Sequence, residues 1–598
     1  MPLSVMKWPR FLEPVGVILL AAPVFFLPTE ERIVSGILEE RVAITSREMW
    51  RKGEWIVPTM NGELRLQKPP LAYWLVHAHA VMRGSFDDDT LRRPFAVLSV
   101  GAALFVWATA RRLFGPRAAL LAAASLITMA LFVKEGRMAT ADSAQLFCAL
   151  GAWHFYLCNR QALDSGSPPG SRRSGWNQLG FYAFLGLGVL AKGPVILLLC
   201  IVPPVLEAAV TRSLDPLRPL AYLPGIACFL LLALFWPAAV ILQLSAESSP
   251  AGAFRLWWLE SMGKVLPSSG VEDGYKYQRH SHEWHFYLPR LFSAFGVWTP
   301  ALLSALVLGF KRNMAARLPW ILFVVIFISF SLVTEKKQAY LLPLLGPGSL
   351  LVGWFIDAWY PRFQLRLRPV AWALFGFGAV LFGLCVVLAF APQAMDGIVE
   401  RLCGEEGLQV LCTFAVKPIY LVLLGLVAFL GSLGFALGLR RPGPLPAFLA
   451  LSAALSLGTW FYNELKADLS IEEGDMRAVS RVAARLLDPQ APVFCVGTLS
   501  SQAVGSLPGG LVYYLDRPVQ LIEERKILES PANALGDVPA GAGLLINEAR
   551  IETLRGGNLT PLKPGDRPGG RLQGFVARGL VNPEAPGKRD RVQVLQRE

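Results

Sequence analysis

Apolar segments alternate with short polar segments along most of this chain. A helix needs about 20 apolar residues to cross the hydrocarbon core of a bilayer, and thirteen segments of this sequence approach or reach that length. They lie near residues 11–28, 94–110, 117–133, 142–158, 179–191, 194–210, 219–244, 290–310, 318–334, 340–358, 369–391, 418–439 and 445–462. The pattern predicts an α-helical polytopic membrane protein with about 13 transmembrane helices.

The polar segments between the apolar ones indicate an orientation. The first apolar segment follows Lys7 and Arg10 and lacks a small-residue cleavage site, so we expect a retained helix rather than a signal peptide. If the N-terminus is cytoplasmic, every inside loop carries at least two basic residues, as the positive-inside rule requires. These residues are Arg111, Arg112, Arg117, Arg160, Arg172, Arg173, Arg212, Arg218, Lys311, Arg312, Arg317, Arg362, Arg366, Arg368, Arg440 and Arg441. An odd number of spans then places the C-terminal region outside.

Three long segments fall on the outer side: residues 29–93, residues 245–289 and a tail that begins near residue 463. We expect a membrane domain over residues 1–462, which includes the first two segments, and a soluble domain over residues 463–598.

The tail has the pattern of a small α/β domain. APVFCVGT, GLVYYLDRPVQLI and GAGLLINEAR are typical of buried strands, and DMRAVSRVAARLL is typical of an amphipathic helix. Residues 550–598 are rich in Gly, Pro and Arg, and we predict no regular structure there.

The first outer segment is too polar to span a membrane and too apolar for an ordinary linker. Charged residues, from Glu39 to Glu48, decorate one predicted helix, and LAYWLVHAHAVM predicts a second, with turn-rich sequence between them. We expect both helices to lie along the outer membrane surface. The alternative is a solvated cap without chemistry.

Composition and charge narrow the class of function. Hydrophobic residues make up 54% of the chain and charged residues only 17%, whereas soluble domains average about 25% charged residues. The net charge of +13 is scattered between apolar segments, without a basic amphipathic helix or a nucleic-acid-binding motif. Anionic lipid surfaces account for this charge better than nucleic acid does.

Several motifs resemble those of one known family. EERVAITSREMWRKGEWIVPTMNGELRLQKPPLAYWL is similar to the first periplasmic loop of the ArnT-like, protein-mannosyltransferase-related glycosyltransferases with the GT-C fold. EGRMATADSAQLF, LAKGP, HSHEWHFYLPRLF and TEKKQAYLLPLLGP resemble further segments of that family, in the same order. The resemblance covers roughly residues 30–350. It implies the GT-C fold, a bacterial inner-membrane location and a periplasmic C-terminal domain.

The resemblance also implies a reaction. A hexosyl or pentosyl group would pass from a polyprenyl-phosphate-linked sugar to a lipid A-like lipid, a glycan or a protein hydroxyl on the outer face of the membrane. Such a transfer needs a carboxylate that takes the proton from the attacking hydroxyl and cations that hold the leaving phosphate. We expect a monomer that binds the donor, the acceptor and membrane lipids.

The family base is the Asp of an Asp-Glu pair that precedes the REM motif. An ungapped alignment places Leu38 at that Asp and Glu39 at the Glu, whereas a one-residue deletion places Glu39 and Glu40 at the pair. Both glutamates are therefore candidate bases. Asp142 is a second candidate carboxylate, and its alternative role is an N-terminal helix cap.

The outer loops contain basic residues where membrane proteins usually have few. Lys134 and Lys192 lie next to motif residues. The predicted donor phosphate-binding residues are Lys68, Arg41, Arg137, Lys264, Lys336, Lys337 and Tyr340. Lys68 is the strongest candidate, because the two following prolines restrict its backbone at the bilayer surface. Its alternative role is a snorkelling surface charge.

Three further predictions concern histidines and cysteines. His280 and His282 alternate in an outer loop and could bind a divalent cation with Glu39 or Glu40, the alternative being a phosphate-facing loop. His77 and His79 are predicted to be interfacial. Cys403 and Cys412 share one outer loop and could form a disulfide.

Two other functions are weighed against the transferase. A lipid-linked-sugar flippase or transporter is expected to show internal repeats and polar residues in the middle of spans, and we find neither in the sequence. A catalytically inactive relative is compatible with Leu38 at the position of the family Asp.

Overall fold

The computed structural model describes residues 12–26, 34, 37–168, 171–246, 249–262, 283–312, 314–333, 336–390, 418–441, 443–472, 476–496, 509–515, 519–522, 538–547, 564–565, 575–581 and 592–597. The chain divides into two compact units. The membrane unit comprises residues 1–29, 55–57 and 66–465, and the sheet unit comprises residues 30–54, 58–65 and 466–598. The first outer segment therefore contributes residues to both units.

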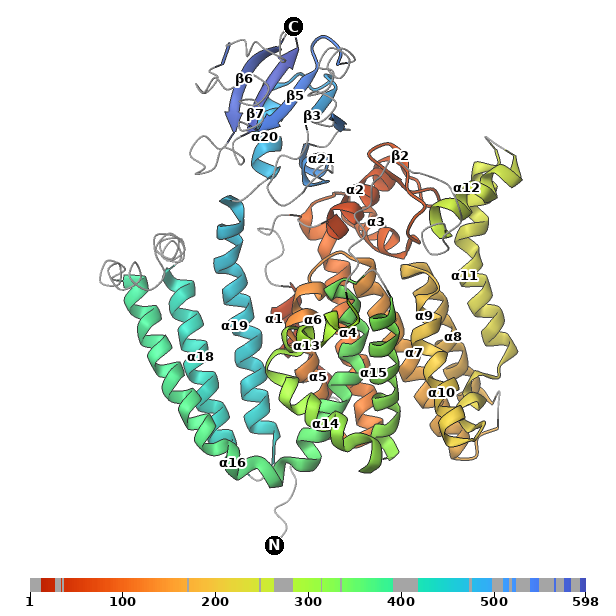
Figure 1. Ribbon diagram of the computed structural model, residues 1–598, viewed down its shortest axis with the longest axis vertical. Coiled ribbons are helices and arrows are strands. Elements are labelled where there is room, and N and C mark those ends of the chain that lie inside the picture. Colours follow the sequence, from red (N-terminus) through yellow and green to blue (C-terminus); the bar gives the residue numbers. More distant parts are fainter. Residues whose placement is uncertain are drawn as a thin grey trace. The chain divides into compact units, whose positions relative to one another are not determined.

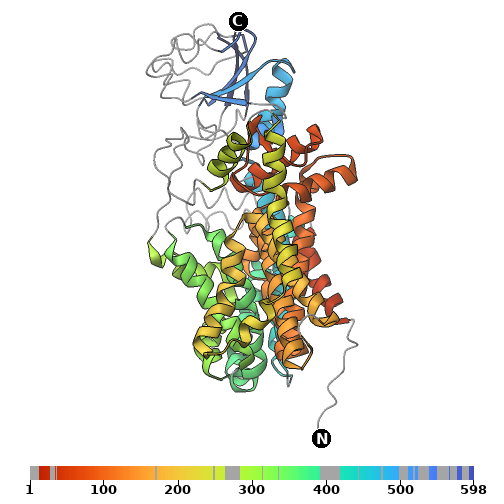
Figure 2. The ribbon, with the colours of Figure 1, turned by 90° about the vertical axis from the view of Figure 1, so that its right-hand side faces the viewer.

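The membrane unit is helical, and its longer helices run alongside one another (Figures 1 and 2). The helices described in this unit, long and short, are α1 (Leu12–Phe26), α3 (Leu71–Arg83), α4 (Asp88–Phe114), α5 (Pro116–Ile127), α6 (Ala130–Gly136), α7 (Ala141–Asp164), α8 (Arg172–Lys192), α9 (Val195–Cys200), α10 (Val202–Thr211), α11 (Leu223–Leu244), α12 (Pro250–Met262), α13 (Tyr287–Phe295), α14 (Thr299–Arg312), α15 (Met314–Leu332), α16 (Leu342–Phe390), α18 (Pro418–Gly438) and α19 (Leu445–Glu472). Short 3₁₀ turns connect some of them: η1 (Asp215–Leu220), η2 (Trp284–Phe286), η3 (Gly296–Trp298) and η4 (Gln338–Leu341).

Every apolar segment found in the sequence overlaps at least one of these helices. Six of the described helices are long and apolar enough to cross a membrane, and α5 and α6, bent by 64° at their junction, make a seventh if they count as one span. The chain is therefore a helical, multi-pass membrane protein. The total of about thirteen spans stays a prediction.

One predicted inside loop, between residues 358 and 369, is instead helical. Both flanking segments belong to the single helix α16. The segment is helical although it contains Pro361, and its side chains bind the chain at the end of α18: Gln364 Nε2 donates to the Leu439 carbonyl at 2.7 Å and Tyr360 Oη donates to the Arg441 carbonyl at 3.2 Å. These hydrogen bonds stabilise the helical form of a segment whose polar residues led to the prediction of a loop.

Small residues allow close helix packing in the core of the membrane unit. A Cβ atom on Gly353 of α16 would lie 2.6 Å from the Ala118 carbonyl oxygen of α5, so only glycine fits there. Aromatic side chains fill the wider spaces. Phe25 of α1 and Phe132 of α6 meet edge to face with ring centroids 5.2 Å apart. This contact positions α6 at one end of the bundle.

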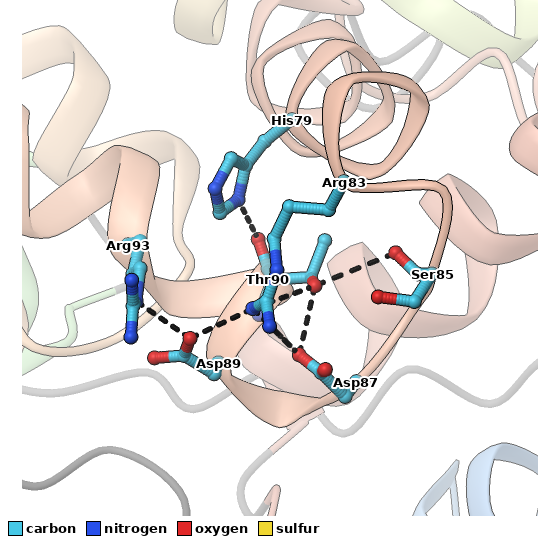
Figure 3. Close-up of polar contacts among 7 residues, drawn as sticks. All are labelled: His79, Arg83, Ser85, Asp87, Asp89, Thr90 and Arg93. Carbon is cyan, nitrogen blue, oxygen red and sulfur yellow. Dashed lines mark hydrogen bonds and ion pairs between the residues drawn. The ribbon is translucent and has the colours of Figure 1, made fainter.

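A polar network joins α3 to α4 (Figure 3). Asp87 caps α4 by accepting a hydrogen bond from the Thr90 amide at 2.6 Å. Arg83, in the last turn of α3, pairs with the buried Asp89 at 2.7 Å. His79 Nδ1 lies 2.9 Å from the Thr90 carbonyl oxygen. The α3–α4 corner is therefore held by charged hydrogen bonds as well as by apolar packing.

The sheet unit contains a five-stranded mixed sheet in the order β4-β3-β5-β7-β6. Its strands are β3 (Val493–Val496), β4 (Val519–Ile522), β5 (Gly543–Asn547), β6 (Phe575–Val581) and β7 (Val592–Arg597). β3 is parallel to β4 and β5, whereas β7 is antiparallel to β5 and β6. Among the described residues, the C-terminal part also contains helices α20 (Met476–Leu486) and α21 (Gly509–Leu515).

Two predictions for this tail are wrong. GLVYYL, read as part of a strand, forms helix α21, because a short buried apolar run has no periodicity that separates strand from helix. β6 and β7 lie where we predicted no regular structure. They form because β7 pairs with β5, a strand about 50 residues earlier, and local composition does not reveal such pairing.

Residues of the first outer segment form α2 (Ile37–Lys52) and a hairpin of β1 (Thr59–Met60) and β2 (Glu63–Leu64). Asn61 and Gly62 at the hairpin turn have φ values of 56° and 84°, as a tight two-residue turn requires. Residues 42–47 of α2 are all buried. Because this run exceeds one helical turn, other parts of the chain cover α2 on every side over these residues, which its charged sequence did not indicate. The position of α2 along the outer membrane surface stays a prediction.

Candidate active site

The LAKGP motif places a lysine at the last position of α8. Gly193 follows with φ +85°, a left-handed conformation that glycine adopts without strain and that ends the helix. Pro194 then precedes α9. Lys192 therefore lies at the negative end of the α8 macrodipole, where a cation is stabilised.

Asp142 lies in the first turn of α7, at the positive end of that helix. The helix cap is Thr140, whose side chain accepts a hydrogen bond from the Ser143 amide. Capping is thus not the role of Asp142. Its carboxylate instead accepts a hydrogen bond from Lys192 Nζ, and the two side chains are 8% and 12% exposed. The structure therefore brings together a buried ion pair from the ends of two helices.

The segment around Tyr340 completes this cluster. Lys192 Nζ lies 4.5 Å from the centroid of the Tyr340 ring, a cation–π contact. The Lys337 carbonyl accepts hydrogen bonds from the Tyr340 amide at 3.0 Å and from Tyr287 Oη at 3.3 Å. Lys336 is buried and Lys337 is half-buried. Two predicted lysines thus lie on the segment whose tyrosine contacts Lys192.

Arg137 ends the short helix α6 next to α7. Ser143 Oγ donates to the Glu135 carbonyl at 2.7 Å, and Ser99 Oγ donates to the Gly136 carbonyl at 3.0 Å. These bonds satisfy the free carbonyls at the end of α6. Arg137 itself is buried, with 5% exposure. The EGRM motif is therefore anchored to both α4 and α7 at the end of the bundle that holds Asp142.

Lys68 precedes α3, whose N-cap is Pro70, and its side chain is exposed. Neighbouring residues are firmly held: Trp74 Nε1 donates to the Trp55 carbonyl at 2.5 Å, and the Trp55 and His77 rings stack with centroids 3.9 Å apart. Because His77 is buried, its prediction as an interfacial residue is wrong. The exposure of Lys68 is compatible with both of its predicted roles.

The candidate bases belong to the sheet unit. Glu39 and Glu40 lie in the first turn of α2, where carboxylates are favoured. Glu39 is fully buried, and Glu40 and Arg41 are half-buried. Burial singles out Glu39 as a carboxylate removed from bulk water.

Some predicted residues lie outside the part of the chain that the structure describes: Lys264, His280, His282, Cys403 and Cys412. Among the described residues, no group of three or more His, Cys, Asp or Glu side chains could hold a metal ion. Sequence reasoning identified Lys192 as an outer-loop cation but missed its pairing with Asp142. LAKGP was the only signal for this residue, since a pairing across 50 residues leaves no local trace.

Comparison with known proteins places these features in context. A family model described as dolichyl-phosphate-mannose-protein mannosyltransferase matches residues 67–238. The chain is 26% identical over 431 residues to an undecaprenyl phosphate-alpha-4-amino-4-deoxy-L-arabinose arabinosyl transferase of Serratia proteamaculans, with 69% of each chain covered. It is 26% identical over 508 residues to a protein of the same name, numbered 1, from Pseudomonas fluorescens, with 79% of each covered.

Solved structures also match over nearly the whole chain. ArnT from Cupriavidus metallidurans superposes with a TM-score of 0.70 in its apo state, with 19% identity and 97% of each chain covered. The structure of that protein bound to undecaprenyl phosphate gives a TM-score of 0.71, with 19% identity and 98% of each chain covered. At this level of identity the likeness establishes the fold.

Proposed function

This chain belongs to the ArnT-like family of GT-C membrane glycosyltransferases, and from that premise we propose that it transfers a glycosyl group from a polyprenyl-phosphate-linked sugar to an acceptor hydroxyl. The relatives named above are arabinosyl transferases that use an undecaprenyl phosphate-linked aminoarabinose. An undecaprenyl-phosphate pentose is therefore the first donor to test, and a lipid A-like glycolipid is the first acceptor.

The observation that carries this proposal is the Asp142–Lys192 ion pair against the Tyr340 ring. A lysine ammonium has three donors, so Lys192 can bind a phosphate oxygen while it keeps its contact with Asp142. Lys336, Lys337 and Arg137 add positive charge on segments anchored to the same helix ends. Preorganised cations of this kind stabilise the charge that grows on a leaving phosphate.

The reaction needs four coupled changes. The acceptor oxygen attacks the anomeric carbon, the bond from that carbon to the phosphate oxygen breaks, and its electron pair stays on the phosphate. A carboxylate takes the proton of the acceptor hydroxyl. We assign this role to Glu39 or Glu40, on the family resemblance of α2, with Asp142 as the alternative. Polyprenyl phosphate is the second product.

Location and domain roles belong to the same proposal. The N-terminus lies in the cytoplasm, the C-terminal domain lies in the periplasm, and transfer takes place on the outer face of the inner membrane. The scattered basic residues of the inside loops support this orientation. A divalent cation at His280 and His282 is a separate proposal, which a chelator added to the transfer assay tests directly.

The test is transfer from a radiolabelled undecaprenyl-phosphate aminoarabinose to lipid A by the purified protein in detergent. Glu39→Gln, Glu40→Gln and the double variant are compared with the wild type. We expect at least one single variant to lower turnover by roughly a hundredfold or more, because a general base contributes about 10²- to 10⁴-fold. Movement of the donor across vesicles without transfer would favour the flippase alternative. If the double variant keeps normal turnover, the base is not on α2 and Asp142 takes its place.

A further inference from the structure

The sheet unit holds α2 through a buried arginine. Arg47 donates one hydrogen bond to the Val512 carbonyl at 3.0 Å and another to the Tyr513 carbonyl. Both carbonyls belong to the last turn of α21, where helix carbonyls have no partner within the helix. The Arg47 guanidinium also lies 4.7 Å from the centroid of the Tyr513 ring. One side chain of α2 thus satisfies two open acceptors of a C-terminal helix.

A second attachment runs through the hairpin. The Asn61 side-chain amide donates to the Val519 carbonyl at 3.0 Å, and its oxygen accepts from the Val519 amide at 3.1 Å. Val519 opens β4, the edge strand of the sheet, so Asn61 occupies unpaired edge groups as another strand would. The backbone N–H of Asn61 in turn donates to the Glu48 carboxylate of α2 at 2.5 Å. Glu48 therefore links α2, the hairpin and the sheet edge.

A third attachment precedes α2. The Val34 amide donates to Tyr514 Oη at 2.7 Å. Helix α21 and the first residue of β4 thus bind the chain before α2, within α2 and after α2. Glu40 lies seven residues before Arg47, close to two turns of about 3.6 residues, so both lie on one face of a continuous helix. Fixing Arg47 consequently fixes the orientation of the first turn, which carries Glu39 and Glu40.

We propose that the C-terminal domain is the platform that orients the carboxylates of α2, and that Arg47 and Asn61 are positioning residues for the transferase. This inference rests on the proposed function, because it assigns the base to Glu39 or Glu40. It gives the soluble domain a role in catalysis although none of its own residues needs to touch the substrate.

The test uses full-length protein with three substitutions and one control. Arg47→Met removes the charge and both hydrogen bonds, Arg47→Lys keeps the charge, and Asn61→Gly removes the side-chain amide but keeps the left-handed turn. Arg51→Met is the matched control, since Arg51 is exposed at the far end of the same helix. For each protein kcat and the donor KM are measured, together with hydrogen exchange of residues 37–52.

We expect Arg47→Met and Asn61→Gly to lower kcat roughly 10- to 100-fold, the cost of a small misplacement of a catalytic group, while donor KM stays within roughly twofold. Arg47→Lys should recover part of kcat. Exchange in α2 should be faster in Arg47→Met and Asn61→Gly, and Arg51→Met should match the wild type. In a Glu39→Gln/Glu40→Gln background, Arg47→Met should cost nothing more, because it acts through those carboxylates.

The results that would contradict this inference differ from those that would contradict the proposed function. Normal kcat in Arg47→Met and Asn61→Gly, in an enzyme whose turnover depends on Glu39 or Glu40, overturns the inference and leaves the proposed function standing. A loss that matches the fraction of unfolded protein, or a full further loss in the carboxylate-free background, also overturns it. A wild-type protein that transfers no sugar overturns the proposed function and the inference together.

Discussion

Replacing the buried Asp142–Lys192 pair tests whether it serves structure or catalysis. Lys192→Met removes the cation and leaves the Asp142 carboxylate buried, with 8% of its side chain exposed. The double variant Asp142→Leu/Lys192→Met replaces both charges with apolar side chains of similar size. The two variants therefore differ in whether an uncompensated charge is left in the protein.

The expected energies follow from the burial of the pair. Removing one partner of a buried ion pair costs about 3–5 kcal/mol, whereas replacing both partners with apolar residues is often neutral or stabilising. We therefore expect Lys192→Met to lower the apparent Tm in detergent clearly and the double variant to recover it. Transfer should not recover. Loss of a preorganised charge at the leaving phosphate costs about 10²–10³ in turnover, and this applies to both variants.

A second ion pair of the membrane unit provides the control. Arg160 lies near the other end of α7 and pairs with the buried Glu207 of α10 at 2.7 Å. Arg160→Met and Arg160→Met/Glu207→Leu should show the same pattern in Tm, with transfer that follows stability. If the Asp142→Leu/Lys192→Met variant regains transfer together with stability, its pair is structural and the catalytic assignment is refuted. If that variant is as unstable as Lys192→Met, the two charges do not compensate each other.

Three further outcomes are expected. Gly136→Ala should lower Tm and transfer, because its Cβ would lie 2.7 Å from both Phe25 Cε1 and Ser99 Oγ, and overpacking of this kind costs about 1–3 kcal/mol; an unchanged Tm would show that α6 shifts freely. Lys68→Ala should weaken use of the donor by about 1.5–3 kcal/mol, the free energy of a hydrogen bond to a charged group, and Lys68→Arg should weaken it less. Normal donor kinetics in Lys68→Ala would show that Lys68 is a membrane-surface charge and does not bind the phosphate. A reporter fused after residue 462 should be active outside the cytoplasm and one inserted at 165–175 inside it; activity of both on one side would contradict the span count.

The fold of the membrane unit could be read from the sequence because spanning helices have a strong local signal. An apolar run of sufficient length in lipid must satisfy its backbone internally and therefore forms a helix. The signal weakens where an element depends on distant partners. Residues 359–368 extend α16 and bind the end of α18, and β7 pairs with β5. Neither partner can be seen in the local pattern.

The same distinction applies to the candidate site. Motifs identified Asp142, Lys336, Lys337 and Tyr340 as residues of interest, yet spacing along the chain gave no indication that Lys192 pairs with Asp142 or stacks on Tyr340. The burial of α2 was also missed. Its charged residues are typical of a surface helix, but Arg47 forms hydrogen bonds with α21 and Glu48 forms one with the hairpin. A helix rich in charged residues is exposed to solvent only when no other part of the chain supplies hydrogen-bond partners for those residues.

The placement of the ion pair bears on how a donor phosphate could bind. Asp142 lies at the positive end of α7 and Lys192 at the negative end of α8, so each charge is stabilised by its own helix, by about 0.3–1 kcal/mol at exposed sites and more when partly buried. Lys192 therefore does not depend on Asp142 alone for its orientation. When a phosphate approaches, the ammonium can share its donors while the Tyr340 ring keeps contact with it. A cation held by three independent interactions needs little reorganisation to meet the growing negative charge, which is the property that electrostatic catalysis requires.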